Sequence, residues 1–410
     1  MKDDPGFECY NLYVGTNKKN IAIFFGGKSP EHEVSIITGL QVLNNIDTEK
    51  YNPIPVYVAK NGKWYYNPKF TDPDVFKDMQ KIPFRSTEVT LSPEPTRKTL
   101  TEVNNPLLRK KLNVKIDCVF PCFHGSFGEN GAFQGLFEIT EIPYVGSGIL
   151  GSALGMDKVV GKDIYKAHNI STAPYEIFHK NQLKEGMDEV LSQLERSLNY
   201  PMFVKPAVGG SSIGVTKAKD RVQLKNALEI AATFDSKIIV EQSIENAKEI
   251  NISVIGNYGG ELKVSECEQV FNSGEFLTYD DKYAGKEGRS KGMASTERKI
   301  PAEISKEVKS LIQKTAKEVF HYLNCCGLVR VDFLLKEDPL EAFVIEINTI
   351  PGSMSFYLWE PTGLSFKDMI TKLISLSEER FAQRGENTST FESNILEDFK
   401  AGLKSPKLGQ

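Results

Sequence analysis

The segment RVDFLLKEDPLEAFVIEINTIPG, which begins at Arg330, limits the fold of this chain more than any other feature. Its two apolar runs, VRVDFLL and FVIEIN, are typical of β-strands, and the polar stretch between them is typical of a turn. A hairpin centred on Pro339 pairs Asp332 with Glu346. The same register pairs Arg330 with Asn348. Because alternate side chains of a strand share a face, one face of the sheet then carries all four polar groups.

Two carboxylates and an amide on one face favour a hard metal ion. Asp332, Glu346 and Asn348 offer oxygen atoms, and Mg²⁺ usually binds one or two carboxylates together with substrate phosphates. The alternative is a half-exposed hairpin whose charges face water. Against it, the run VIEIN places a carboxylate inside an otherwise apolar strand, where it needs a partner or a metal. The segment therefore predicts a metal site that also binds nucleotide phosphates.

Length and composition narrow the class of protein. A chain of 410 residues exceeds what one hydrophobic core usually serves, so two or three domains are expected. A net charge of −4 gives no general attraction to nucleic acid or to anionic membranes. The six cysteines are scattered and form no CxxC pair, which favours reduced thiols. No export signal or run of about 20 apolar residues is evident, so we expect a cytoplasmic protein.

Strands and helices alternate in the first part of the chain. A strand NIAIFFGG, a helix EHEVSIITGLQVLNNI and a strand YNPIPVYVAK follow one another, which predicts a parallel sheet with crossover helices. The expected units are a polar extension 1–19, an N-terminal domain 20–150 with an insertion at 67–112, a central subdomain 151–243, a C-terminal subdomain 244–384 that includes a long loop 270–300, and a polar tail 385–410.

A glycine-rich turn in YPMFVKPAVGGSSIGV is a candidate phosphate site. Lys205 ends a strand, and the turn Gly209–Gly214 follows it. Glycines let backbone N–H groups approach an anion, and Lys205 adds a positive charge. The order of lysine and glycines is the reverse of a Walker A loop, and an ordinary glycine turn is the alternative. Lys158, after GSALGMD, is a second candidate cation.

Two further motifs follow strands, where open α/β sheets bind ligands. FFGGKSPEHEVS carries Glu31 and Glu33 at a helix start, although acidic residues there can also simply stabilise the helix dipole. CFHGSFGENGAFQG places His124 beside glycine, which leaves it little to pack against. The charged loop near Lys282 and Tyr283 is long enough to be a lid or a disordered segment.

Together these motifs resemble D-alanine:D-alanine ligases of the ATP-grasp superfamily over residues 20–380. The similar segments are FFGGKSPEHEVS, FHGSFGENGAFQG, IPYVGSGILGSALGMDK, YPMFVKPAVGGSSIGV, YDDKY, GLVRVDF and EINTIPG. The resemblance implies an α/β, three-domain ATP-grasp architecture with a Rossmann-like N-terminal domain. It also implies that the nucleotide lies between the sheets of the central and C-terminal subdomains.

The resemblance implies a two-step ligation. The carboxylate of one D-alanine attacks the γ-phosphate of ATP, and the amine of a second D-alanine displaces phosphate from the acylphosphate to give D-alanyl-D-alanine for peptidoglycan precursors. Two Mg²⁺ ions, replaceable by Mn²⁺, are then held by Asp332, Glu346 and Asn348. The resemblance further implies a cytoplasmic homodimer that binds neither nucleic acid nor a membrane.

Further site residues are carried over from the same resemblance. Arg330 and the Gly352 N–H stabilise the oxyanion of the second step. Glu33 binds the ammonium of the first D-alanine and forms a hydrogen-bonded trio with Ser211 and Tyr283. His124 lies close to that D-alanine's carboxylate. The implied ATP-binding residues are Lys158, Lys205, Ser212, Glu241, Gln242, Ile244, Glu249 and Lys282.

The chain departs from the family after Gly352, where GSMSFYLWEP is shorter than in typical members. Ser353 or Ser355 could bind the carboxylate of the second substrate. The acceptor therefore stays open among D-alanine, D-lactate, D-serine and another amino acid. A non-catalytic nucleotide-binding regulator is a third reading, but it predicts loss of a metal ligand or a phosphate-binding lysine, and these residues are all present.

Overall fold

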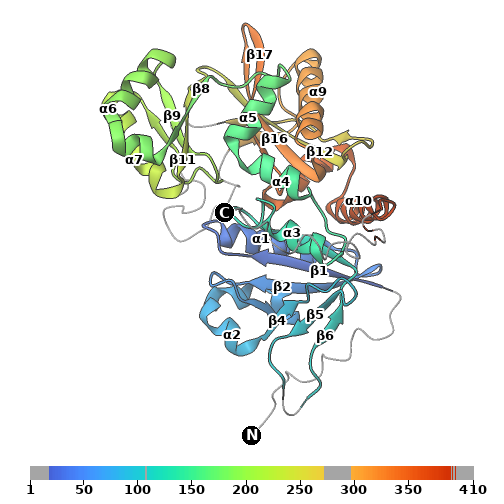
Figure 1. The fold of residues 1–410 in the computed structure, drawn as a ribbon. Helices are drawn as coiled ribbons and strands as arrows, with labels where there is room; N and C mark the ends of the chain where they lie inside the picture. The colour runs from blue at the N-terminus through green and yellow to red at the C-terminus, as the bar shows by residue number, and fades with distance from the viewer. Residues whose placement is uncertain (1–17, 107–108, 272–296, 389, 391–392, 394–410) are drawn as a thin grey trace, which may run out of the picture.

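The structure, a computed structural model, describes residues 18–106, 109–271, 297–388, 390 and 393. These residues form three sheets, and in Figure 1 the central and C-terminal sheets lie side by side above the N-terminal sheet. The lid residues Lys282 and Tyr283, most of the extension 1–19 and most of the tail 385–410 lie outside the described residues. No helix within the described residues is long and apolar enough to cross a membrane.

The N-terminal sheet has seven strands in the order β6-β5-β4-β3-β2-β1-β7, with β2, β1 and β7 parallel and the others antiparallel. The predicted strand–helix–strand start is confirmed, and segment 67–112 adds β4 and β5 to the sheet. The strands are β1 (Lys19–Gly26), β2 (Tyr51–Val58), β3 (Trp64–Tyr66), β4 (Thr87–Leu91), β5 (Thr99–Glu102), β6 (Asn113–Lys115) and β7 (Cys118–Pro121). The helices are α1 (His32–Asn45), η2 (Pro68–Thr71), η3 (Pro73–Lys81), α2 (Ile82–Arg85) and α3 (Ala132–Ile139).

The central sheet is antiparallel, in the order β10-β9-β11-β8, and α6 and α7 cover it (Figure 1). Helix α7 begins where the Asp220 carboxylate accepts a hydrogen bond from the Gln223 N–H, and its buried residues recur at helical spacing. The elements are α4 (Ile149–Met156), α5 (Lys158–Ala167), β8 (Tyr175–His179), α6 (Lys180–Ser197), β9 (Met202–Pro206), β10 (Thr216–Ala218), α7 (Arg221–Phe234) and β11 (Lys237–Gln242).

The C-terminal sheet is also antiparallel, in the order β15-β14-β12-β16-β17 with β13 beside β12. Helix α9 packs on β12 and β16 through an apolar stripe that includes Ile312 and Phe320. The elements are β12 (Lys248–Asn257), β13 (Lys263–Val264), β14 (Glu268–Phe271), β15 (Glu297–Lys299), α9 (Lys306–Tyr322), β16 (Cys326–Glu337), β17 (Leu340–Asn348), η5 (Gly352–Leu358), η6 (Glu360–Thr362) and α10 (Phe366–Gly385).

The hairpin β16–β17 confirms the predicted pairs at its functional end. Asp332 lies opposite Glu346, and Arg330 lies opposite Asn348. Closer to the turn the register shifts, so that Phe333 pairs with Val344 and Ile345 is the extra residue of a β-bulge. The single register predicted from Pro339 is therefore wrong beyond the bulge. Without the bulge, Asp332 would face Ile345 and the two carboxylates would not be partners.

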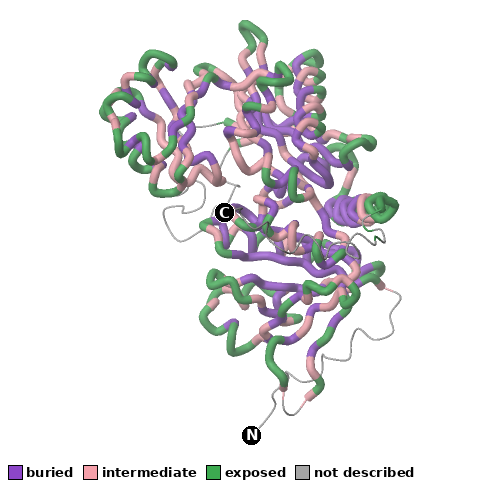
Figure 2. Tube along the Cα trace, viewed as in Figure 1, coloured by how far each residue is buried: buried purple, intermediate pink, exposed green. Residues whose placement is uncertain are grey.

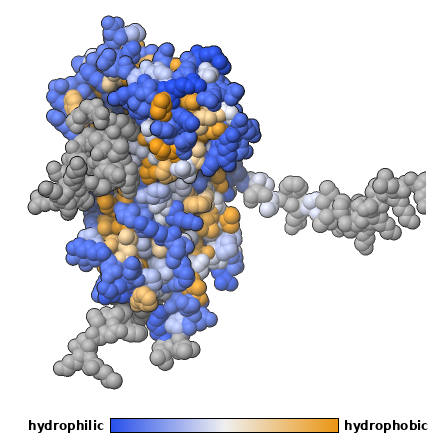
Figure 3. Space-filling view, turned by 90° about the vertical axis from the view of Figure 1, so that its left-hand side faces the viewer, coloured by the Kyte–Doolittle hydropathy of each residue, from blue (hydrophilic) through white to orange (hydrophobic). Residues whose placement is uncertain are grey.

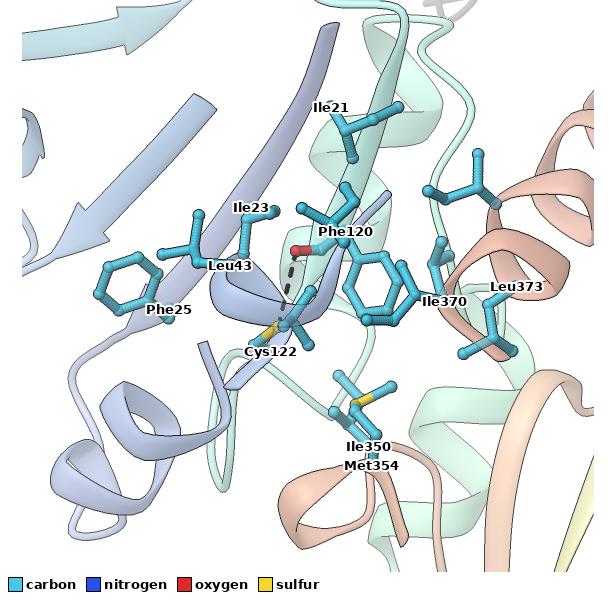
Figure 4. Close-up of a cluster of buried hydrophobic side chains, with 14 of the residues drawn as sticks. Ile21, Ile23, Phe25, Leu43, Phe120, Cys122, Ile350, Met354, Ile370 and Leu373 are labelled. Carbon is cyan, nitrogen blue, oxygen red and sulfur yellow. Dashed lines mark hydrogen bonds between the residues drawn. The ribbon is translucent and has the colours of Figure 1, made fainter. Parts of the chain in front are cut away.

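One hydrophobic cluster joins the first and last parts of the chain (Figure 4). Ile23 of β1 and Phe120 of β7 belong to it. So do Ile350, Met354 of η5 and Leu373 of α10. The central strands of each sheet are largely buried (Figure 2). The face shown in Figure 3 is mostly hydrophilic, with hydrophobic residues near its middle. Because this cluster spans both parts, the loops after β1 and β7 lie at defined positions against the hairpin β16–β17.

Candidate active site

A pocket of about 290 Å³ lies where the three sheets meet. Loops after β1 and β7, strand β9 and the polar face of β12, β16 and β17 all contribute to its wall. The pocket brings together most of the residues predicted from the sequence, namely His124, Lys158, Lys205, Ser211, Ser212, Glu249, Arg330, Asp332, Glu346, Asn348 and Gly352.

Asp332 is the centre of the polar face. Its two carboxylate oxygens accept hydrogen bonds from Nε and Nη2 of Arg330, both at 2.7 Å, and Oδ2 also accepts from Asn348 Nδ2 at 3.0 Å. Burial by itself would lower the pKa of Arg330, but the Asp332 carboxylate outweighs it and raises that pKa well above its usual range. The guanidinium therefore keeps its charge, and Asp332 holds it in a planar, two-bond geometry.

The same face fits a Mg²⁺ site that is completed by phosphate. Glu346 pairs with Asp332 across the hairpin, and its Oε2 lies 3.7 Å from Nζ of Lys158. No group of three or more His, Cys, Asp or Glu side chains within the described ranges could hold a metal alone. Two carboxylates and an amide are the donor set that Mg²⁺ accepts when substrate phosphates supply further oxygens.

The glycine-rich turn after β9 faces this carboxylate pair. Lys158 donates to the carbonyl of Gly209, which brings its positive charge to the turn. Ser211 and Ser212 both have left-handed backbones, with φ of 52° and 60°. Non-glycine residues in this conformation cost about 1–3 kcal/mol each and persist only when their surroundings hold them. The turn is thus held open toward the pocket, as phosphate binding requires.

Glu31, and not Glu33, faces the pocket. Ser211 Oγ donates a hydrogen bond to Glu31 Oε1, and Glu31 is buried. Glu33 instead forms an ion pair with Lys60 at 2.6 Å, and nearly half of its side chain is exposed. The predicted Glu33–Ser211 contact is therefore wrong. Residues two apart in a helix point roughly 200° apart, so only one of the two glutamates at the start of α1 can face the turn.

Two glycines allow the surrounding loops to close on Glu31. A Cβ at Gly210 would lie 2.9 Å from Glu31 Oε2, and a Cβ at Gly125 would lie 2.7 Å from the same atom. Gly125 also has φ of 77°, a conformation that favours glycine. The carboxylate is therefore enclosed by three loops, which belong to β1, β7 and β9.

His124 is buried next to the polar face that carries Asp332 and Glu346. Its Nε2 lies 2.8 Å from Oγ1 of Thr38, which accepts a hydrogen bond from the Ser353 N–H at 3.2 Å. Burial lowers the pKa of His124 to about 4, with a smaller contribution from Arg330 in the same direction. The imidazole is therefore neutral at pH 7. It can position a substrate carboxylate by hydrogen bonding but does not supply a charge.

The sequence did not point to Glu129, which also lines the pocket. Its carboxylate accepts from the N–H groups of Gly125 at 2.7 Å and Ile350 at 3.2 Å, so it joins the loop after β7 to the segment after β17. Burial, followed by repulsion from Glu31, raises the pKa of Glu129. The glutamate in FHGSFGEN was visible in the sequence, but nothing in its spacing predicted a contact with Ile350.

The predicted nucleotide residues occupy two kinds of position. Glu249 lines the pocket, whereas Glu241 is buried behind it between Lys205 at 2.8 Å and Lys162 at 3.4 Å. Gln242 Oε1 accepts from the Asn199 N–H at 2.9 Å. The roles of Glu241, Gln242 and Ile244 in nucleotide binding stay predictions. Lys162 was missed because a lysine in the middle of a helix carries no motif.

Neither serine predicted to bind the second substrate lines the pocket. Ser355 is fully buried, and Ser353 contacts Thr38 through its backbone. Residues 353–355 have left-handed backbones with φ of 52°, 52° and 46°, so the chain turns sharply and brings Tyr357 to the pocket wall. The roles of Ser353 and Ser355 stay predictions, and this geometry does not favour them. An aromatic residue within an apolar stretch gave no signal of this position.

Comparisons with known proteins agree over nearly the whole chain. Residues 20–147 match the D-ala D-ala ligase N-terminus, and residues 164–375 match the D-ala D-ala ligase C-terminus. A D-alanine–D-alanine ligase of Thermosipho melanesiensis is 40% identical over 379 residues, which cover 92% of this chain and 98% of that protein. A protein of the same description from Ruminiclostridium cellulolyticum is 40% identical over 389 residues, covering 92% and 100%.

Solved structures share the architecture. The VanG D-Ala:D-Ser ligase of Enterococcus faecalis has a TM-score of 0.74 and 33% identity, with 88% of this chain and 99% of that chain covered. The D-alanine-D-alanine ligase of Coxiella burnetii has a TM-score of 0.76 and 25% identity, with 95% and 100% covered. The three-domain architecture expected from the sequence is confirmed by these likenesses.

Proposed function

Because the chain belongs to the D-alanine–D-alanine ligase family, we propose that its pocket joins two molecules of D-alanine in a reaction that converts ATP to ADP and phosphate. The enzyme is an ATP-dependent ligase whose product, D-alanyl-D-alanine, enters peptidoglycan precursors. One observation carries the proposal. The phosphate-binding turn, the carboxylate pair Asp332–Glu346 and the buried Glu31 converge on a single pocket.

The first step brings two anions together, because the carboxylate of the donor D-alanine attacks the γ-phosphate of ATP. Lys158 and Lys205 offer positive charge to the phosphates beside the glycine turn. Mg²⁺ would be held by Asp332, Glu346 and Asn348, and when bound it neutralises phosphate charge and orients the chain of phosphates. The bond between the γ-phosphorus and the oxygen that bridges to the β-phosphate breaks, so the step gives an acylphosphate and ADP in the site.

The donor D-alanine needs a partner for each of its charged ends. Glu31 would bind the ammonium group, because it is a buried carboxylate that Ser211 fixes at the pocket wall. His124 would form a hydrogen bond with the carboxylate of the donor, as a neutral imidazole close to Arg330. This proposal replaces Glu33 with Glu31 in the role of ammonium partner.

In the second step the amine of the acceptor attacks the carbonyl carbon of the acylphosphate. A tetrahedral intermediate forms, the C–O bond to phosphate breaks, and the amine loses a proton as the peptide bond forms. Arg330 and the N–H of Gly352 line the pocket where this oxyanion would develop. Asp332 fixes the Arg330 guanidinium in advance, so little reorganisation is needed when the charge appears.

The family membership also supports several finer proposals. We expect two Mg²⁺ ions per active site, with Mn²⁺ as a substitute, and a cytoplasmic homodimer that binds neither nucleic acid nor a membrane. Equilibrium binding of a non-hydrolysable ATP analogue with and without Mg²⁺ tests the need for the metal. Sedimentation at several protein concentrations tests the homodimer.

Product analysis with D-alanine alone tests the proposed function. We expect one ADP, one phosphate and one D-alanyl-D-alanine for each turnover, measured by chromatography of the reaction with ATP and Mg²⁺. D-Serine and D-lactate are offered next, because one structural relative is described as a D-Ala:D-Ser ligase. If ATP is consumed only when one of these accompanies D-alanine, the acceptor in the proposal is wrong.

The two glutamates at the start of α1 give a matched pair of variants. Glu31→Gln is expected to lower kcat/KM for D-alanine by about 100-fold, because removing one partner of a buried charged contact costs about 2–5 kcal/mol. Glu33→Gln removes the same charge two residues away, where it only faces Lys60 at the surface. Its kcat/KM should stay within about twofold of the parent. Equal losses in the two variants would contradict the assignment of Glu31.

A further inference from the structure

A second group of polar side chains lies at the end of the pocket away from Lys158 and Lys205. Glu268 of β14, Arg298 of β15 and Tyr357 of η5, here called the Arg298 cluster, all line the pocket. Arg298 Nη1 lies 3.1 Å from Glu268 Oε1, and its guanidinium lies 5.0 Å from the centre of the Tyr357 ring. The Tyr357 hydroxyl lies 3.5 Å from Glu268 Oε2.

Strand register places the cluster on the catalytic face. Glu268 pairs with Asn251, Asn251 pairs with Asp332, and Asp332 pairs with Glu346. These four residues form one row across four adjacent strands. Two strand spacings separate Glu268 from Asp332, roughly 10 Å. All four residues line the pocket, so the cluster and the carboxylate pair face the same cavity.

Charge distinguishes this end of the pocket from the phosphate end. Among the described residues that line the pocket, four are basic: Lys158, Lys205, Arg298 and Arg330. The two lysines accompany the phosphate turn, and Arg330 is bound at two points by Asp332. Arg298 is the basic group that lines the far end of the pocket, where Glu268 holds one side of its guanidinium. A guanidinium keeps its charge at all working pH values and can bind a carboxylate through two parallel hydrogen bonds.

Burial shows how the cluster is held. Glu268 is 1% exposed and also accepts from Asn251 Nδ2 at 3.3 Å, whereas a quarter of the Arg298 side chain is exposed. Burial, partly opposed by Arg330, raises the pKa of Tyr357, so its hydroxyl remains protonated and can donate. Glu268 thus serves as a fixed support that accepts a long, 3.5 Å hydrogen bond from the Tyr357 hydroxyl, and Arg298 and Tyr357 both line the pocket.

We propose that Arg298 and Tyr357 bind the carboxylate of the acceptor amino acid and that Glu268 positions Arg298 for this contact. The inference rests on the proposed function, because only a ligation with a separate acceptor needs a second carboxylate site. It replaces Ser353 and Ser355 as the residues that face the acceptor. The acceptor is accordingly an amino acid with an ionised carboxylate, bound with its amine toward the acylphosphate held near Arg330.

The test compares two acceptors in the parent enzyme and in Arg298→Gln. D-Alanine has the carboxylate, and D-alaninamide lacks it and cannot act as donor. In Arg298→Gln, kcat/KM for D-alanine as acceptor should fall by about 100-fold, while kcat/KM for D-alaninamide should stay within about threefold. Tyr357→Phe keeps the ring under Arg298 and loses one hydroxyl, so a loss of about tenfold with D-alanine is expected.

Two controls separate binding from general damage. Arg298→Gln leaves the Glu268 carboxylate buried without its guanidinium partner. The double variant Arg298→Gln/Glu268→Gln removes that carboxylate charge as well, and it should show the same loss of kcat/KM for D-alanine as acceptor. Lys299→Gln removes a positive charge from the same strand at an exposed position and should change neither acceptor. Isotope exchange between the bridging and non-bridging oxygens of labelled ATP reports on phosphorylation of the donor without the ligation step. This exchange should persist in Arg298→Gln.

Each outcome has one meaning. If the parent enzyme makes no dipeptide from D-alanine, the proposed function fails whatever Arg298 does. If the parent is active and Arg298→Gln keeps its kcat/KM for D-alanine as acceptor, the acceptor site is not at Arg298. Equal losses of exchange, of D-alanine ligation and of D-alaninamide ligation would also overturn the inference, since they would show damage to the whole site.

Discussion

Glu346→Gln is expected to lower the rate of dipeptide formation by about 1000-fold or more, which corresponds to about 4 kcal/mol of lost transition-state stabilisation. The substitution keeps the shape of the side chain and removes one of the two carboxylates on the polar face of β16–β17. Without that charge, the site holds Mg²⁺ and the phosphates of ATP less well, and Lys158 loses its nearby carboxylate. Steady-state rates over a Mg²⁺ titration measure the effect.

Glu337→Gln is the matched control. It removes a carboxylate from the other end of the same hairpin, where Glu337 pairs with Lys248 and is about half exposed. Its turnover should equal that of the parent enzyme, and both variants should retain the parent circular dichroism spectrum. Normal turnover in Glu346→Gln would refute the assignment of Glu346 to the metal site.

Glu241→Gln is expected to destabilise the folded enzyme by about 3 kcal/mol at pH 7. Glu241 is buried between Lys162 and Lys205, and the neutral variant would leave two lysines close together without a counter-charge. Burial already lowers the pKa of Lys162 to about 8 although Glu241 opposes that shift. Urea unfolding followed by circular dichroism measures the change, with the exposed Glu245→Gln as the control.

The pH dependence of this difference has a definite sign. Burial by itself would raise the pKa of Glu241, but Lys162 and Lys205 outweigh it and lower that pKa from 4.5 to about 2. The carboxylate therefore stabilises the fold fully above pH 4.5, and this contribution is lost as the pH falls toward 2. The difference in the free energy of unfolding between the parent and Glu241→Gln should therefore become smaller below pH 4.5. A gap that stays constant down to pH 3 would contradict a buried, ionised Glu241.

The hairpin illustrates how much the sequence could predict. Alternation of apolar and polar residues in VRVDFLL and FVIEIN placed the polar side chains of each strand on one face, and an assumed turn at Pro339 placed Asp332 opposite Glu346. The bulge at Ile345 was not predictable in this way. It depends on how the two strands twist and pack on helices α4, α9 and α10, and a one-residue shift exchanges the faces of every later side chain.

The start of α1 shows the opposite case. The motif GGKSPEHEVS contains two glutamates that are both compatible with a helix N-terminus, and local pattern does not choose between them. The choice depends on Ser211, which is 180 residues away and faces Glu31 only after the central sheet has packed on the N-terminal domain. The same reason applies to Tyr357, which reaches the pocket through the left-handed turn of residues 353–355.

Motifs and periodicities confined to short stretches were sufficient to predict the family and the pairing of Asp332 with Glu346. They also led to the proposal that Asp332, Glu346 and Asn348 hold Mg²⁺. The tertiary structure was needed to show that Glu31 faces the pocket and that Lys162 shares Glu241 with Lys205. These contacts join loops far apart in the chain, and their formation depends on how the sheets pack. Packing is a property of the whole fold, and no short segment encodes it.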